Sequence, residues 1–122
     1  MKTALSELPA YTTKDGSEIR ELLHPKLHGA NNQSLAEATI QPGQSTQLHR
    51  HAITEEIYHV TQGEGRMRLG ESEFPIRAGD TILILPGTAH QVSAGGKAVL
   101  KILCCCSPAY DHEDTEIICR EN

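Results

Sequence analysis

The stretch TQLHRHAITEEIYHVTQGEG, residues 46–65, sets histidines and glutamates beside a β-forming run that ends in glycines. His49 and His51 stand two residues apart, and Glu55 and Glu56 follow them. Burying an imidazole or a carboxylate without a partner costs free energy, so packing alone does not explain this combination. The stretch therefore predicts a site at which these side chains hold something.

Strand geometry indicates what that site could hold. Side chains two residues apart on a strand share a face, with Cα atoms roughly 7 Å apart, so His49 and His51 could converge on one ion. A turn would bring Glu56 back beside them on a second strand, and His90 follows a further turn, LPGTAH. Three imidazoles and one carboxylate suit a first-row divalent metal, so we predict metal ligation by His49, His51, Glu56 and His90.

The rest of the chain predicts an all-β protein. Glycine and proline separate short runs of β-branched or alternating residues: SLAEATIQPG (34–43), EEIYHVTQGEG (55–65), RMRLGESEFPIRAGD (66–80), TILILPG (81–87) and AVLKILCCCSP (98–108). Short strands with turn signals between them favour a sandwich or a barrel. The segment SEIRELLHP (17–25) fits either a single helical turn, which Pro25 would end, or a strand that leads into the fold.

The spacing of these residues resembles the paired motifs of the cupins. Gly43, His49, His51, Glu56 and Gly63 match the first motif. In the second, Gly79, Gly87 and His90 match, whereas Leu85 stands where proline is most common and Ala94 where asparagine is common. The resemblance implies a double-stranded β-helix, the cupin jelly-roll barrel, with a metal ion inside it.

A closer resemblance is to small single-domain cupins labelled as similar to mannose-6-phosphate isomerase. The segments SLAEATIQPG, EEIYHVTQGEGRM and CCCSPAYDHEDTEI carry it. It implies a usually dimeric protein. Because 122 residues fit one domain, we expect one cupin domain over residues 1–122, with a motif core at 43–94, a leading segment at 1–33 and a C-terminal tail at 107–122. It implies no particular substrate, because cupins include oxygenases, isomerases, lyases and binding proteins.

Several further side chains could line the cavity beside the metal. Tyr58 and Gln62 share a face with Glu56, and Gln47 shares one with His49, so these three are the candidate catalytic residues. Tyr58 could equally be a packing residue whose hydroxyl group is satisfied. Alternation along the last long strand would turn Cys104 and Cys106 inward.

The cysteines and the remaining histidines have simpler interpretations. Cys104, Cys105, Cys106 and Cys119 suit neither a disulfide framework nor a zinc ribbon, so we expect free and mostly buried thiols. His24, His28 and His112 lie in polar segments and are expected at the surface, and the acidic tail is expected to be a solvated end. His59 should face away from Glu56.

Composition narrows the partners. The chain of 122 residues has a net charge of -5 and lacks a basic stripe, so we expect no nucleic-acid partner. The start of the chain meets Pro9 and charged residues before an apolar run could build, and no stretch has membrane-spanning length, so we expect a cytoplasmic protein without a membrane partner. Exposed strand faces such as the one that carries Ile57 and His59 favour a homodimer.

Two functions fit these features. The first is an enzyme, an oxygenase, isomerase or lyase, that acts on a small polar molecule chelating the ion through its oxygens. The second is a non-catalytic module that binds or stores a small molecule. Mn, Fe, Ni or Co would fit the ligand set better than Zn, although Zn often occupies such sites in recombinant protein. A phosphorylated sugar is less favoured, because Arg50 should point away from the ligands and Arg66, Arg68 and Arg77 lie near turns.

The choice of carboxylate depends on strand register. Either Glu55 or Glu56 could follow His51 at a suitable distance, but alternation lets only one of them face the metal. Glu56 stands at the motif position relative to Gly63, and its face also carries Tyr58 and Val60. We therefore predict that Glu56 faces the ion and Glu55 faces solvent.

Overall fold

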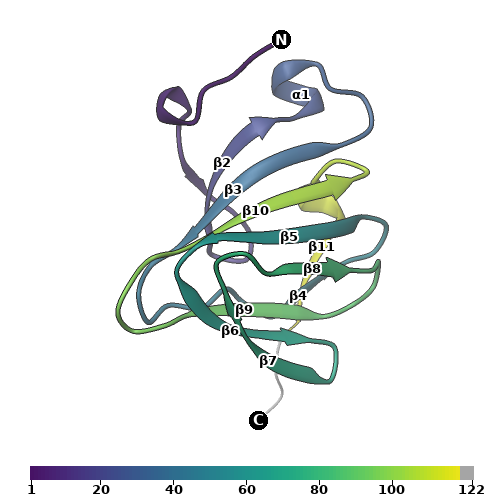
Figure 1. Cartoon of the computed structure of the whole chain (residues 1–122). Helices are drawn as coiled ribbons and strands as arrows, with labels where there is room; N and C mark the ends of the chain where they lie inside the picture. The colour runs from purple at the N-terminus through teal and green to yellow at the C-terminus, as the bar shows by residue number, and fades with distance from the viewer. Residues whose placement is uncertain (119–122) are drawn as a thin grey trace.

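The computed structural model describes residues 1–118, and these form two facing β-sheets (Figure 1). The six-stranded sheet runs in the order β1 (Tyr11–Thr12), β2 (Glu18–Leu23), β3 (Ser34–Ile40), β10 (Leu100–Ser107), β5 (Glu55–Gln62) and β8 (Thr81–Ile84). The five-stranded sheet runs in the order β11 (Thr115–Ile117), β4 (His49–His51), β9 (His90–Ala94), β6 (Glu64–Leu69) and β7 (Ser72–Arg77). The all-β jelly-roll prediction is confirmed.

Helix is confined to three short pieces of the described chain. These are the 3-10 turns η1 (Leu5–Glu7) and η2 (His112–Asp114) and the helix α1 (Pro25–His28). The segment SEIRELLHP takes the strand alternative, because β2 pairs with β3 along its length. Pro25 then begins α1 rather than ending a helix, since proline is tolerated at the first helical position. No helix within residues 1–118 is long and apolar enough to span a membrane.

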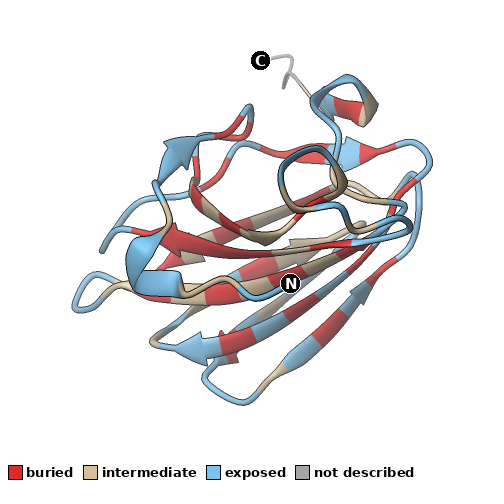
Figure 2. Ribbon diagram, turned by 90° about the horizontal axis from the view of Figure 1, so that it is seen from above, coloured by how far each residue is buried: buried red, intermediate tan, exposed pale blue. Residues whose placement is uncertain are grey.

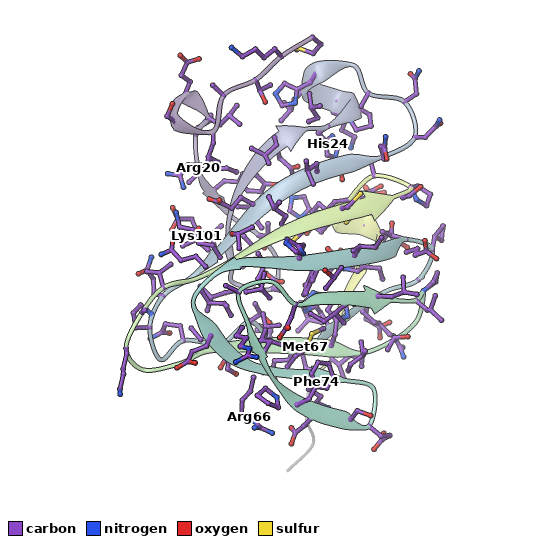
Figure 3. All side chains as sticks on the ribbon, in the orientation of Figure 1. Arg20, His24, Arg66, Met67, Phe74 and Lys101 are labelled. Carbon is purple, nitrogen blue, oxygen red and sulfur yellow. The ribbon has the colours of Figure 1, made fainter. Side chains whose placement is uncertain are left out.

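The core lies between the two sheets, where each strand turns alternate residues inward (Figure 2). On β5, Glu56, Tyr58 and Val60 are buried while the residues between them are exposed. Met67 on β6 is 1% exposed and packs with the partly buried Phe74 of β7 (Figure 3). Each such fully buried side chain contributes about 1.5–3 kcal/mol of hydrophobic free energy.

The glycine that ends β5 fixes the register of the motif. Gly63 has φ 84°, and a Cβ atom there would clash with the carbonyl oxygen of Val99. Only glycine fits so close an approach in a left-handed conformation. The turn therefore holds β5 against the segment that leads into β10, with Glu56 on the inner face.

The outer face of the six-stranded sheet carries an apolar row. Cross-strand pairs align Leu35 with Cys105, Cys105 with Ile57, and Ile57 with Leu83. Ile57 is 40% exposed and Leu83 is 52% exposed. This row, Leu35–Cys105–Ile57–Leu83, crosses four neighbouring strands and gives the sheet an uncovered apolar surface.

Candidate metal centre and its cavity

Adjacent strands of the five-stranded sheet bring three histidines together. β4 and β9 pair at His49 and His90, whose ring centroids lie 4.1 Å apart, and His51 lies on the same face of β4. One ligand nitrogen from each of the three rings lies within 4.8 Å of the others. All three residues are at least nine-tenths buried. The histidines are thus close enough to hold one metal ion.

Each ring is held through Nδ1 by an acceptor. The Nδ1 of His49 lies 2.7 Å from the Gln47 carbonyl oxygen, and that of His90 lies 2.9 Å from the Thr88 carbonyl oxygen. Because a carbonyl only accepts, both rings donate through Nδ1, and in a neutral ring this leaves a lone pair at Nε2. Such partners fix the tautomer and the orientation of metal-binding histidines.

His51 follows the same arrangement through a side chain. Its Nδ1 lies 3.0 Å from the Thr115 hydroxyl oxygen, and that hydroxyl donates its own proton to the Asp111 carbonyl oxygen. Thr115 therefore accepts from His51, which again directs Nε2 of the neutral ring inward. The Nε2 atoms of all three histidines therefore point toward the same place, where they could bind one metal ion.

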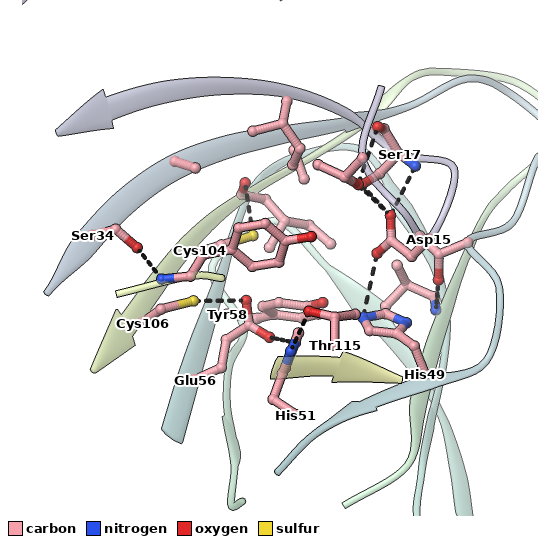
Figure 4. Close-up of a pocket in the computed structure, with 18 of the residues that line it drawn as sticks. Asp15, Ser17, Ser34, His49, His51, Glu56, Tyr58, Cys104, Cys106 and Thr115 are labelled. Atoms are coloured by element: carbon pink, nitrogen blue, oxygen red, sulfur yellow. Dashed lines mark hydrogen bonds and ion pairs between the residues drawn. The ribbon is translucent and has the colours of Figure 1, made fainter. Parts of the chain in front are cut away.

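Glu56 directs a carboxylate at two of these nitrogens, and Figure 4 shows its contact with His51. Its Oε1 lies 3.3 Å from Nε2 of His51 and 3.5 Å from Nε2 of His90. Cys106 Sγ donates to the other oxygen at 3.3 Å. Within residues 1–118, Glu56 Oε1 and His90 Nε2 are buried without a hydrogen-bond partner. Two facing acceptors need a cation between them, so the donor set fits a divalent ion.

Burial and neighbouring charges shift the titration of this group. Burial, assisted by His90, lowers the pKa of His49 from 6.5 to about 4. Burial alone would raise the pKa of Glu56, but when the rings of His51 and His90 are protonated, their Nε2–H groups donate to its carboxylate and lower the pKa to about 2. At neutral pH the His49 ring is therefore uncharged and the Glu56 carboxylate is anionic, the protonation states that metal binding requires.

A cavity of about 40 Å³ opens beside the histidines. Tyr58, Cys104 and Cys106 line it, and burial raises the pKa of all three. Both thiols are free and keep their protons, as expected for buried cysteines. Cys105 is partly exposed on the outer face, and Cys119 lies outside the described residues.

Two of the three candidate catalytic residues are not at the cavity. The side chain of Gln62 is exposed, because a register shift on β10 pairs it with Lys101, which faces outward. Gln47 precedes β4 and is also exposed, so strand alternation does not apply to it. The expected placement of both beside Tyr58 is wrong. Gln47 reaches the site only through its carbonyl group, which holds His49.

The C-terminal tail is part of the site rather than a solvated end. β11 pairs with β4, and Thr115 is 3% exposed at the cavity wall beside Tyr110. The Asp114 carboxylate accepts the backbone N–H groups of Ile53 and Thr54. The expectation of a solvated end is therefore wrong for this tail. Its acidic composition gave no indication that Thr115 faces inward.

The four remaining histidines differ in exposure. His24 is 8% exposed, because its ring caps α1 by accepting from the Lys26 N–H and contacts the Tyr110 carbonyl oxygen. The expectation of a surface residue is wrong for His24. His112 is exposed, and His28 is partly exposed at the end of α1. His59 is also exposed and faces away from Glu56.

The leading segment supplies a carboxylate that the sequence did not reveal. Asp15, in the turn between β1 and β2, places Oδ2 at 3.3 Å from Nε2 of His49. Its Oδ1 accepts from the Thr13 hydroxyl group and from both the N–H and the hydroxyl group of Ser17. The stretch TKDGS reads as an ordinary polar turn, so only the folded chain shows its contact with the histidines.

Comparisons with known proteins agree with this architecture. The cupin domain family matches residues 36–106, which include all three histidines and Glu56. The chain belongs to the cupins. An uncharacterized protein of Methanocaldococcus jannaschii, MJ1618, is 49% identical to this cupin over 97% of the chain and 94% of its own length.

Two further relatives show how widely the fold is used. An oxalate-binding protein of Thermotoga maritima is 30% identical over 70% of this cupin and 71% of its own length. The polyketide cyclase RemF of Streptomyces resistomycificus superposes with a TM-score of 0.81 at 19% identity, over 99% of this chain and 87% of RemF. The latter likeness shows a shared fold only.

Proposed function

We propose that this cupin binds one divalent metal ion through His49, His51, Glu56 and His90. The supporting observation is that Glu56 Oε1 and His90 Nε2 lie buried 3.5 Å apart, and neither atom has a hydrogen-bond partner within residues 1–118. Partners at Nδ1 already direct the imidazoles inward. Mn, Fe, Ni, Co or Zn would suit this mixture of nitrogen and oxygen donors.

We further propose that the metal site acts on a small polar molecule that chelates the ion through adjacent oxygens. A bound ion supplies Lewis acidity and a template for such a ligand. Tyr58 keeps its proton at neutral pH and can donate it to a ligand oxygen in the cavity. Cys106 holds one oxygen of Glu56 and so orients the other toward the imidazoles. Oxygenase, isomerase and lyase reactions all use these elements.

The alternative is a non-catalytic binding or storage module. A relative at 30% identity, from Thermotoga maritima, is named an oxalate-binding protein, and this name favours the binding function. An assay for product formation distinguishes the two functions, since a binding module leaves its ligand unchanged.

The closer resemblance to mannose-6-phosphate isomerase-like cupins does not decide between the two functions. The cytoplasmic location and the single domain over residues 1–122 stay predictions.

The metal proposal is tested by metal analysis of untagged protein together with thermal unfolding. We expect about one divalent ion per chain and a lower melting temperature after chelation, because the ion binds the folded state preferentially. Adding the metal back should restore the melting temperature. A protein that carries no metal, and whose melting temperature neither chelator nor added metal changes, would overturn the proposal.

We also propose a homodimer formed through the outer face of the six-stranded sheet. The row Leu35–Cys105–Ile57–Leu83 offers a self-complementary apolar strip, as a two-fold interface requires. Light scattering at micromolar concentration should report a dimer. Leu83→Asp should convert it to a monomer that keeps its metal, and a wild-type monomer would contradict the proposal.

A further inference from the structure

The turn that joins β1 to β2, together with β2 itself, lines one wall of the cavity with carboxyl groups. Asp15 and Glu21 both border the cavity: Asp15 contacts His49, and Glu21 lies on the six-stranded sheet, which faces the sheet that carries the histidines. They are 9% and 6% exposed, respectively. Neither belongs to the proposed ligand set. Hydrogen bonds within its turn account for the burial of Asp15, whereas the burial of Glu21 needs another explanation.

Glu21 has one oxygen satisfied and one free. Oε1 accepts the Tyr11 hydroxyl proton at 2.5 Å. Oε2 is buried without a hydrogen-bond partner among residues 1–118. Leaving such an oxygen unpaired costs free energy, and a donor on a ligand in the cavity would recover it. Glu21 is thus prepared to accept a hydrogen bond from a bound molecule.

The charges that line the cavity also favour a ligand that donates hydrogen bonds and carries no negative charge. Asp15, Glu21 and Glu56 line the cavity, whereas no lysine or arginine of the described chain does. A divalent ion would leave this group with one net negative charge, two positive against three negative. A dianion would meet repulsion from Asp15 and Glu21 that a low-dielectric cavity strengthens. The wall therefore disfavours dicarboxylates.

We propose that the cavity selects an uncharged ligand with hydroxyl donors, and that Glu21 Oε2 accepts one of them. This inference rests on the proposed metal site and names the class of molecule it takes. Glu21 is a specificity residue: it discriminates against dianions by charge and favours polyols by hydrogen bonding. A dicarboxylate such as oxalate is the opposite class.

Calorimetry with two probes of equal heavy-atom number, glycerol and oxalate, tests the selection on metal-loaded protein. Glu21→Gln removes the charge and keeps the shape. We expect it to strengthen oxalate binding at least about tenfold and to weaken glycerol binding a few-fold, because charge-assisted hydrogen bonds are stronger than neutral ones. Wild-type protein should bind glycerol more tightly than oxalate.

Glu37→Gln is the matched control. Glu37 is similarly buried, and its Oε1 has no hydrogen-bond partner within residues 1–118, although Lys101 Nζ lies 3.8 Å from it. Glu37 lies on β3 outside the cavity lining. Neither probe's affinity should change in this variant. Tighter binding of oxalate by the wild type, or equal effects of the two substitutions, would overturn the ligand class. Metal content measured on the same samples separates the failures, because metal-free protein would overturn both proposals.

Discussion

Two walls of the cavity hold carboxylates in different ways. On β5, Glu56 lies within 3.5 Å of two imidazole nitrogens, and its second oxygen accepts from a thiol. In the leading segment, Asp15 contacts one imidazole nitrogen, and its second oxygen accepts from its own turn. The first wall directs its carboxylate at the imidazole nitrogens of the proposed metal site, whereas hydrogen bonds of the second wall stabilise its own turn. Metal affinity should therefore depend on the first wall far more than on the second.

The largest expected effect is the pH dependence of metal-free protein. The pKa of His49 falls from 6.5 to about 4 on folding, so below pH 6.5 the unfolded chain takes up a proton that the folded chain does not. The free energy of unfolding should fall by about 3 kcal/mol as the pH drops from 7 to 4. Glu56 titrates in a lower window, between 4.5 and about 2.

Urea unfolding of chelator-treated protein at several pH values measures this effect. His49→Gln removes the titrating ring while keeping a side chain that can hydrogen-bond, so its stability should vary less over the same pH range. Parallel pH profiles for the variant and the wild type would show that His49 is not held uncharged by burial.

Asp15→Ala tests the other wall. It removes the oxygen that accepts from the Thr13 hydroxyl group and from both Ser17 donors, so it should lower the free energy of unfolding of metal-free protein by about 2 kcal/mol. Glu71→Ala, at an exposed position, should change it by no more than about 0.5 kcal/mol. Urea unfolding compares the two. Equal stability of both variants would show that the turn does not depend on Asp15.

Thr115→Val should give the smallest effect. The substitution keeps the shape but removes the oxygen that accepts from His51 Nδ1. Losing such an orienting partner should lower metal affinity about tenfold, with the metal still bound at high concentration. Competition with a chelator of known affinity measures the change. Unaltered affinity would show that β11 merely covers the site.

The sequence predicted that Glu56 faces the histidines, but it did not indicate that Asp15 reaches them. His49, His51, Glu56 and His90 follow from strand alternation and motif spacing, which depend on local geometry. Asp15 and Thr115 reach the site through pairings between distant segments, β2 with β3 and β11 with β4, and neither leaves a periodic signal.

Gln62 shows the limit of strand alternation. Continued from Glu56, alternation would turn it inward, but the irregularity in the β5–β10 pairing turns it out. Such a register shift depends on the partner strand and on the close approach at Gly63, so the β5 sequence alone does not reveal it.

Metal binding through Glu56 is tested by comparing the metal content of two neighbouring variants, Glu56→Gln and Glu55→Gln. Glu56 is 4% exposed and faces the imidazoles, whereas Glu55 is exposed on the outer face. Removing the anionic ligand should deplete the metal in the Glu56 variant, while the Glu55 variant should keep about one ion per chain, because its charge is solvated. Metal lost from the Glu55 variant and retained by the Glu56 variant would show that Glu55, and not Glu56, binds the ion.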